Sequence, residues 1–529
     1  MTMQIKDLEK RLKDGRIGRR EFLRGATALG VSVAAATAFA GKVQAATPKK
    51  GGKLRLGLGH GSTTDALDPA TYENLYVQVM GGALHNKLTV IGNSGDLGPE
   101  LAESWEPTPD AIQWRFKLRQ GVEFHNGKTL EADDVIASFN HHRGEDSKSA
   151  AKPIVDPIED IKADGKDTVV FTMKTGNADF PFIVSDYHLA IMPSKDGKID
   201  AMAGIGAGSY TLDSFDPGVR TALKRFPNYW RSDRGHFDSA ELLSIIDPAA
   251  RTNALVTGEI DAMDRVDIKT AHLLALNPNV NIVETSGTAH YTFAMRTDTP
   301  PFDNNHVRLA LKHALDRKAM LQTVLRGRGV VGNDHPIGRS NRFHADELPQ
   351  REYDIDKAKF HLKKAGLSSL KVDLSAANAA FDGAVDAAVL YKEHAAKAGI
   401  EITVVREPND GYWSNVWMKK PWCAVYWGGR PTEDWMFSTA YAAGAPWNDT
   451  FWEHERFNKL LIEARAELDQ AKRRAMYFEM QTIVRDEGGV VVPMFNNYVM
   501  GLSKKVAHEK MGANWSLDGF RAIERWWFA

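Results

Sequence analysis

The sequence contains a single cysteine, Cys423, among its 529 residues. The chain can therefore form neither an internal disulfide nor a cluster of thiolate metal ligands. Common catalytic patterns are also missing: there is no Gly-x-Ser-x-Gly elbow and no zinc-protease helix motif, and the third glycine of a dinucleotide loop is replaced by Ser62. These absences argue against an enzyme, and we predict neither a cofactor nor a metal site.

A strong excess of charge of either sign is also absent, because 67 Lys and Arg face 68 Asp and Glu. No basic run with interleaved aromatic residues occurs, so nucleic acid is not an expected partner. The length exceeds what one hydrophobic core normally supports, and it indicates two or three lobes.

The first 45 residues have the features of an export signal. Gly18–Arg24 resembles the twin-arginine motif, Gly25–Ala40 is apolar and rich in alanine, and Val43-Gln44-Ala45 offers small residues for cleavage. We expect residues 1–45 to be a signal peptide used by the twin-arginine export machinery, which leaves a periplasmic protein. The alternative is an amphipathic helix followed by a membrane anchor, but the apolar run is short for a span.

Period-two and helical patterns predict the local structure of the first half. Trp114, Phe116 and Leu118 alternate with polar residues, as in a half-buried strand. Val122–Phe124 is predicted to return as a second strand. Asp133 and Asp134 then begin a predicted helix, where acidic residues favour the positive end of the helix dipole.

Helices alternate with strands in the second half. Helices are predicted to start at Asp303 and Asp469 and to cover Gly383–Lys397, and strands are predicted at Ile400–Val405 and Val490–Val492. Repeated helix–strand succession indicates α/β lobes.

Several motifs in fixed order identify a family resemblance. They are Leu-Ala-x-Ser-Trp at Leu101–Trp105, Trp-x-Phe-x-Leu-Arg at Trp114–Arg119, Gly-Val-x-Phe-His-Asn-Gly at Gly121–Gly127 and Ala-x-Asp-Val at Ala132–Val135. Together they resemble the signature block of extracellular solute-binding protein family 5, the peptide- and nickel-type binding proteins of ABC importers.

The resemblance implies a periplasmic-binding-protein-like fold with two α/β lobes joined by a two-stranded hinge. Residues 46–287 would form lobe I, with an extra subdomain at about 75–210, residues 288–495 would form lobe II, and residues 496–529 would return to lobe I. The crossings are expected near Thr285–His290 and Pro493–Val499.

The resemblance also places the ligand between the lobes. It implies contacts from the loop after the first strand, which contains His60 and Ser62, and from a Trp-Gly loop. This Trp-Gly loop supplies Trp427, Gly428, Arg430, Glu433 and Asp434. Arg339 and Asn496 are secondary candidates for ligand contact.

Arg430 is a departure from the family pattern, because related peptide binders often carry a carboxylate in this loop. The planar guanidinium of an arginine can donate two parallel hydrogen bonds to a carboxylate or phosphate, so we predict a ligand with an acidic group. The alternative is a solvated loop that an ion pair between Glu433 and Arg430 closes.

The resemblance implies the periplasmic substrate-binding component of an ABC importer. It would be a monomer that captures a short peptide, a modified amino acid or an opine-like compound by hinge closure. It would deliver this small-molecule ligand to a permease driven by ATPase subunits. A receptor for chemosensing or signalling is the main alternative, and an exported enzyme is a further one.

Overall fold

The computed structural model describes residues 26, 48–409 and 411–529. Apart from Ala26, the expected signal peptide lies outside these residues, and it stays a prediction. No helix in the described part of the chain combines the length and apolar character that a membrane span requires.

The largest sheet in the described residues is mixed and has eleven strands. Its order is β10 (Tyr210–Asp216), β11 (Arg220–Arg225), β12 (Ser239–Ser244), β1 (Lys53–Leu58), β13 (Ala262–Met263), β19 (Val490–Ser503), β14 (Val280–Met295), β18 (Trp422–Trp427), β16 (Leu370–Ala376) and β17 (Ile400–Arg406), with β15 (Gly329–Val331) paired to β19. Strand β1 is parallel to both its neighbours, whereas β14 and β19 are antiparallel to each other. The expected mixed α/β class is confirmed.

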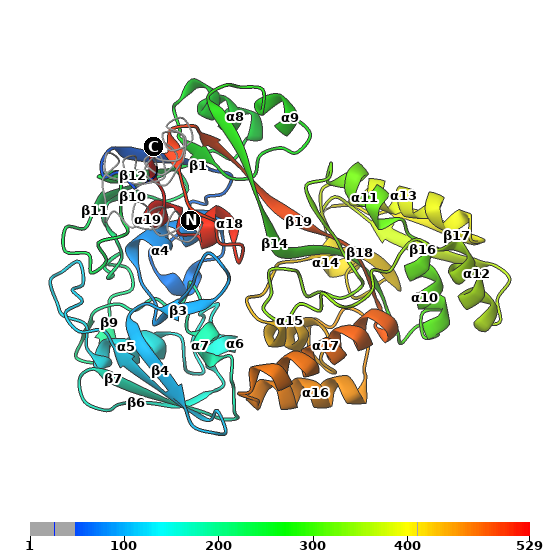
Figure 1. Cartoon of the computed structure of the whole chain (residues 1–529), viewed down its shortest axis with the longest axis horizontal. Helices are drawn as coiled ribbons and strands as arrows, with labels where there is room; N and C mark the ends of the chain where they lie inside the picture. The colour runs from blue at the N-terminus through cyan, green and yellow to red at the C-terminus, as the bar shows by residue number, and fades with distance from the viewer. Residues whose placement is uncertain (1–25, 27–47, 410) are drawn as a thin grey trace.

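The long strands β14 and β19 connect two bodies of structure, as Figure 1 shows. They pair from Val280 opposite Ser503 to Ala294 opposite Val490. The register shifts between Ser286 and His290, at the middle of the ribbon. Both strands extend well beyond the short segments that periodicity predicts, because their central residues are only partly apolar.

Four hydrophobic clusters lie on either side of this ribbon. One draws on residues 293–495, and we call the structure around it body II. Two others draw on residues 54–84, 210–280 and 499–526, and the fourth on residues 88–207; we call the structure around these three body I. The fourth cluster includes the sheet β4 (Ala102–Pro107), β5 (Gln113–Leu118), β7 (Thr168–Met173) and β6 (Ile158–Ala163).

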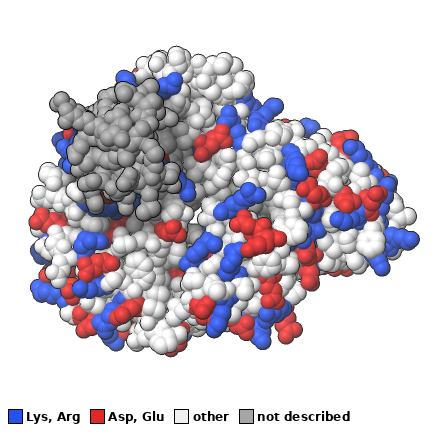
Figure 2. Space-filling view, in the orientation of Figure 1, with Lys and Arg blue, Asp and Glu red and all other residues white. Residues whose placement is uncertain are grey.

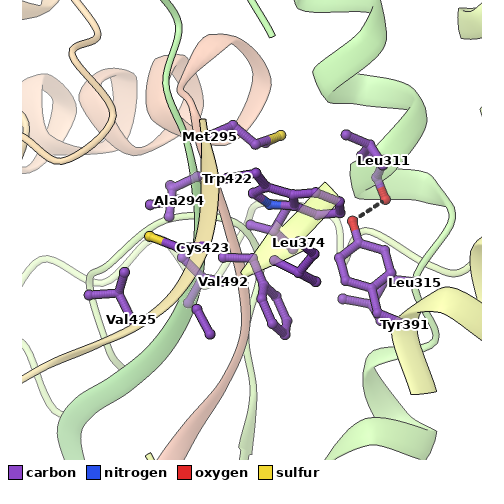
Figure 3. Packing of buried hydrophobic residues seen from close by; sticks show 14 of the residues in the cluster. Ala294, Met295, Leu311, Leu315, Leu374, Tyr391, Trp422, Cys423, Val425 and Val492 are labelled. Atoms are coloured by element: carbon purple, nitrogen blue, oxygen red, sulfur yellow. Dashed lines mark hydrogen bonds between the residues drawn. The ribbon is translucent and has the colours of Figure 1, made fainter. Parts of the chain in front are cut away.

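The core of body II is built around large aromatic side chains (Figure 3). Trp422 on β18 is fully buried and meets Tyr391 edge to face, with ring centroids 5.4 Å apart. The Tyr391 hydroxyl donates a hydrogen bond of 2.7 Å to the Leu311 carbonyl. This bond satisfies the one polar atom of a phenol that is otherwise enclosed by apolar side chains.

The main helices cover the sheet and carry the expected caps in most cases. They are α4 (Leu75–Leu84), α5 (Ala132–His141), α8 (Pro248–Thr257), α10 (Asn305–His313), α11 (Arg317–Val324), α12 (Ile355–Lys364), α13 (Ala384–Ala396), α15 (Glu433–Ala440), α16 (Glu455–Ala466) and α17 (Gln470–Glu487). Asp469 caps α17 as predicted, by accepting from the backbone N–H groups of Ala471 and Lys472.

Two local predictions are wrong. Val122–Phe124 does not return as a strand, because its pairing is limited to one isolated bridge between Glu123 and Thr129, in which the Phe124 N–H donates to the Lys128 carbonyl at 2.9 Å. Helix α10 is capped by Asn304 and not by Asp303, since the Asn304 side chain accepts from the His306 N–H. Because Asp303 and Asn304 are adjacent and both suit an N-cap, the sequence alone does not decide at which of them helix α10 begins.

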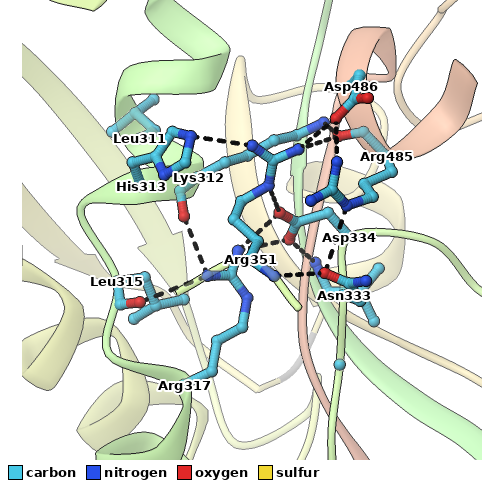
Figure 4. Close-up of polar contacts among 12 residues, drawn as sticks. Leu311, Lys312, His313, Leu315, Arg317, Asn333, Asp334, Arg351, Arg485 and Asp486 are labelled. Carbon is cyan, nitrogen blue, oxygen red and sulfur yellow. Dashed lines mark hydrogen bonds and ion pairs between the residues drawn. The ribbon is translucent and has the colours of Figure 1, made fainter. Parts of the chain in front are cut away.

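A buried network of charges holds body II next to the ribbon (Figure 4). The Asp334 carboxylate, which is fully buried, pairs with Arg317 at 2.7 Å and with Arg351 at 2.8 Å. It also accepts a hydrogen bond from the Val492 N–H on β19. Lys312 donates to backbone carbonyls at the end of α17, so every charge in the network has a partner.

Candidate ligand-binding site

The Trp-Gly loop lies at the junction of β18 with the hinge region of β14. Strand β18 ends at Trp427, and α15 begins six residues later at Glu433. A Cβ atom on Gly429 would lie 1.6 Å from the Thr288 hydroxyl oxygen, so only glycine fits against β14 at this point. The loop is therefore pressed onto the segment where the β14–β19 register shifts.

Arg430 is half-buried in this loop and has no carboxylate partner. Its guanidinium donates to the carbonyl of Gly428 at 2.9 Å, and within the described residues no carboxylate oxygen lies within 4.0 Å of it. Burial lowers the pKa of Arg430, while Tyr187 and Asp186 of body I raise it. The ion pair between Arg430 and Glu433, on which the alternative of a solvated loop depends, is absent from the described structure.

Glu433 and Asp434 are turned into body II and bonded to the protein. The Glu433 carboxylate accepts from the Phe343 N–H at 2.6 Å, and Asp434 pairs with Arg465 at 3.1 Å. Both side chains are buried. They hold neighbouring segments in place, and Arg430 is left as the charged group of the loop that has no partner of opposite sign.

His60 and Ser62 lie in a loop that is folded on itself. The Ser62 N–H donates to the Asp65 carboxylate at 2.8 Å, and its hydroxyl contacts Thr64 at 2.7 Å. Burial and the nearby Arg265 lower the pKa of His60 to about 4, so its imidazole is neutral at pH 7. No contact joins His60 or Ser62 to Arg430 among the described residues.

Arg339 lies within the loop at residues 336–342, and Asn496 lies on the neighbouring strand β19. Arg339 is exposed and lines a cavity that also includes Phe495 of β19. Asn496 pairs with Gly329 of β15, and its side-chain oxygen has no partner in the described structure. The Asn341 side chain donates to the Arg430 carbonyl at 3.2 Å, which links this loop to the Trp-Gly loop.

An aromatic patch extends from Trp427, and apart from Trp427 itself its members were not predicted from the sequence. It comprises Trp413, Trp417, Tyr426, Trp427 and Trp447, whose neighbouring ring centroids lie 5.4–6.4 Å apart. Three of its members are markedly exposed: Trp447 and Tyr426 by 50% each and Trp413 by 39%. Exposed aromatic clusters often mark binding surfaces. The only sequence signal was the high tryptophan count.

Asp449 is hydrogen-bonded to one of the tryptophans of this patch. Its buried carboxylate accepts from the indole N–H of Trp417 at 3.1 Å. Burial raises the pKa of Asp449 to about 7, and the indole bond opposes this shift. The carboxyl group bonded to Trp417 therefore titrates near neutral pH.

Asp449→Asn is expected to change the pH dependence of stability. The folded protein keeps the Asp449 proton between pH 3.8 and about 7, whereas the unfolded chain releases it. Wild-type stability should therefore fall as pH rises through this window, by up to about 1.4 kcal/mol per unit relative to the variant. Urea unfolding of both proteins at pH 5 and pH 8 checks this. Parallel pH profiles would contradict the assignment.

The two bodies also meet through a buried carboxylate away from the ribbon. Asp179 of body I pairs with Arg342 at 2.9 Å and with Arg473 at 2.7 Å, both from body II. Arg342 further stacks over Phe182 of body I, at 4.7 Å from the ring centroid. We call Asp179, Arg342 and Arg473 the interbody clasp.

In the described residues no group of three or more His, Cys, Asp or Glu side chains is arranged to hold a metal ion. On the face shown in Figure 2, Lys and Arg are interspersed with Asp and Glu, and they form no large area of one sign. This face has no electrostatic footprint for a polyanion.

Solved structures with the same fold are periplasmic binding proteins. The ABC transporter-associated periplasmic binding protein DppA from Helicobacter pylori, in complex with a peptide, matches with a TM-score of 0.72 and 23% identity over 91% of this chain and 99% of that one. The PBP AgaA from A. tumefaciens R10, in complex with agropinic acid, matches with a TM-score of 0.71 and 24% identity over 90% and 99% of the two chains. The chain thus has the fold of a ligand-binding protein of this class.

The family follows from the sequence. The model of bacterial extracellular solute-binding proteins, family 5 (middle region), matches residues 96–449, so the chain belongs to this family of non-enzymatic binding proteins. The dipeptide-binding protein of Escherichia coli K12 is 25% identical over 77% of this chain and 83% of its own length. Heme-binding protein A of Haemophilus influenzae is 28% identical, but the match spans only 52% of this chain and 54% of that relative.

Proposed function

We propose that the chain is the periplasmic substrate-binding component of an ABC importer and that its solute carries an acidic group. Family membership and the fold support the binding role. The observation that carries the acidic group is the half-buried Arg430, which has no carboxylate partner among the described residues. A partly desolvated guanidinium is stabilised by an anion that brings two acceptor oxygens.

The surroundings of Arg430 define the rest of the solute. The aromatic patch includes Trp427 of the Trp-Gly loop and offers flat apolar surface there, and the ring of Trp435 lies 6.0 Å from the Arg430 guanidinium. A carboxylate with an adjoining ring or chain fits both features. A short peptide, a modified amino acid and an opine-like compound meet this description, and the relative AgaA was solved with agropinic acid.

Capture works by closure of the two bodies. The ribbon of β14 and β19 would act as the hinge, because its register shift at Ser286–His290 interrupts the pairing at the point where the bodies meet. A solute that contacts both bodies favours the closed form by its differential affinity for that form. The closed monomer would then dock on a permease driven by ATPase subunits, after export by the twin-arginine machinery.

Arg430→Ala is expected to weaken solute binding by roughly 10- to 100-fold, which corresponds to the loss of a charged hydrogen-bonding group. Mass spectrometry of small molecules released from the denatured wild-type protein identifies the solute, and calorimetry with that compound measures the loss. Arg430→Lys keeps the charge without the planar fork, so it should recover only part of the affinity. Equal affinities of wild type and Arg430→Ala would refute the acidic-group assignment.

A further inference from the structure

A cavity of about 210 Å³ lies in body II against the middle of the ribbon. Ser286 and Gly287 of β14 and Phe495 of β19 form one side of it, and residues 330–350 form the rest. No described residue before Ser286 contributes to its lining. The cavity is thus separate from the aromatic patch and from the Arg430 guanidinium, and it touches the hinge strands where their register shifts.

Buried polar groups hold the walls of this cavity in place. Asp334, fixed by Arg317 and Arg351, positions its neighbour His335, which lines the cavity. Opposite, the Gln481 side chain accepts from the Ala345 N–H at 3.0 Å and donates to the Phe343 carbonyl at 2.8 Å. The cavity is therefore preformed, and an occupant would not have to order its walls.

The lining combines one positive group, one negative group and an apolar floor. Arg339 is exposed and makes no ion pair with a described residue, and Asp346 accepts from the His344 imidazole at 3.1 Å. Val330 and Phe495 supply apolar surface. The groups at the rim therefore match a zwitterion better than a simple anion or cation.

His335 gives a second, independent indication of a ligand. Its side chain is 1% exposed, and its Nδ1 atom has no hydrogen-bond partner in the described part of the chain. Burial lowers the pKa of His335 to about 3, so the imidazole is neutral and can donate one N–H to an acceptor in the cavity. A buried polar atom without a partner is costly, and a small rotation of the imidazole toward the cavity would let a bound carboxylate oxygen satisfy it.

We propose that this cavity is a second solute site, which binds a free α-amino acid with an apolar side chain. The carboxylate contacts Arg339 and His335, the ammonium group faces Asp346, and the side chain lies on Val330 and Phe495. A volume of about 210 Å³ suits a ligand of the size of a single amino acid. Because the site borders Ser286 and Gly287, its occupant also contacts the hinge.

Binding of L-leucine to the full-length mature protein tests the proposal. Calorimetry with up to about 10 mM L-leucine should show saturable binding to wild type, and Arg339→Gln should weaken it by at least about tenfold. Arg456→Gln, which removes an exposed arginine of α16, is the matched control and should bind like wild type. Arg430→Ala should also bind L-leucine normally, since Arg430 does not line this cavity.

Two analogues test the zwitterion on wild type, so the result does not depend on any variant folding. 4-Methylpentanoate lacks the ammonium group and 3-methylbutylamine lacks the carboxylate, and each should bind at least about tenfold more weakly than L-leucine. Absence of L-leucine binding, or equal binding of the analogues, would overturn the proposal. Loss of binding in Arg430→Ala with Arg339→Gln unaffected would also overturn it and would place L-leucine at the Trp-Gly loop.

Discussion

Asp179→Ala is expected to open the molecule and to reduce solute affinity by about 100-fold or more. The carboxylate joins the two bodies by pairing with Arg342 and with the fully buried Arg473. Removing one partner of a buried pair costs about 3–5 kcal/mol, because the remaining charges stay desolvated without compensation. In an open form both arginines would regain water, so the cost falls mainly on the closed form.

Small-angle scattering and calorimetry measure this effect. The radius of gyration of Asp179→Ala should exceed that of wild type in the presence of solute, and the affinity should fall as the closed population falls. Asp164→Ala is the matched control, since Asp164 pairs with Arg115 on the surface of body I, where an ion pair contributes at most about 1 kcal/mol. Wild-type scattering and affinity in Asp179→Ala would show that the interbody clasp does not stabilise closure.

Asp334→Ala is expected to lower the free energy of unfolding by about 3–5 kcal/mol, and the loss should appear in body II. The substitution leaves Arg317 and Arg351 buried with no central carboxylate, and it frees the Val492 N–H on β19. Urea unfolding at pH 7 measures the change. Asp373→Ala, at an exposed position of β16, is the control and should stay within about 0.5 kcal/mol of wild type.

The same carboxylate predicts an acid-sensitive contribution to stability. Burial raises the pKa of Asp334, but Arg317 and Arg351 outweigh burial and hold the pKa below its ordinary value of 3.8. The contribution is therefore complete above about pH 4 and is lost as pH falls through the folded pKa. Asp334→Ala should flatten the acid limb of the stability profile. A variant as stable as wild type at pH 7 would contradict the role of the network.

The sequence was most informative where structure depends on local chemistry. Asp469 caps α17, and the alternation around Trp114 forms β5, because caps and strand faces are set by neighbouring residues. Arg430 was found because it departs from a family motif. Local rules were less decisive at α10, where Asn304 and not Asp303 makes the capping bond.

The site depends more on contacts between distant segments. Trp413 and Trp447 meet around Trp417 only because the chain folds them together, and no spacing rule connects them. Asp179 likewise finds Arg473 across the two bodies. Glu433 was a reasonable candidate from its position, but the fold turns its carboxylate toward the Phe343 N–H. Such pairings follow from tertiary structure and leave no local pattern.

In the proposed mechanism the two bodies close on an acidic solute and return it unchanged. The most direct test is small-angle scattering of the protein stripped of solute and then supplied with the compound that mass spectrometry recovers from it. We expect a smaller radius of gyration with the compound, no such change in Arg430→Ala at the same concentration, and recovery of the compound intact. An unchanged wild-type profile, or conversion of the compound to a product, would contradict it.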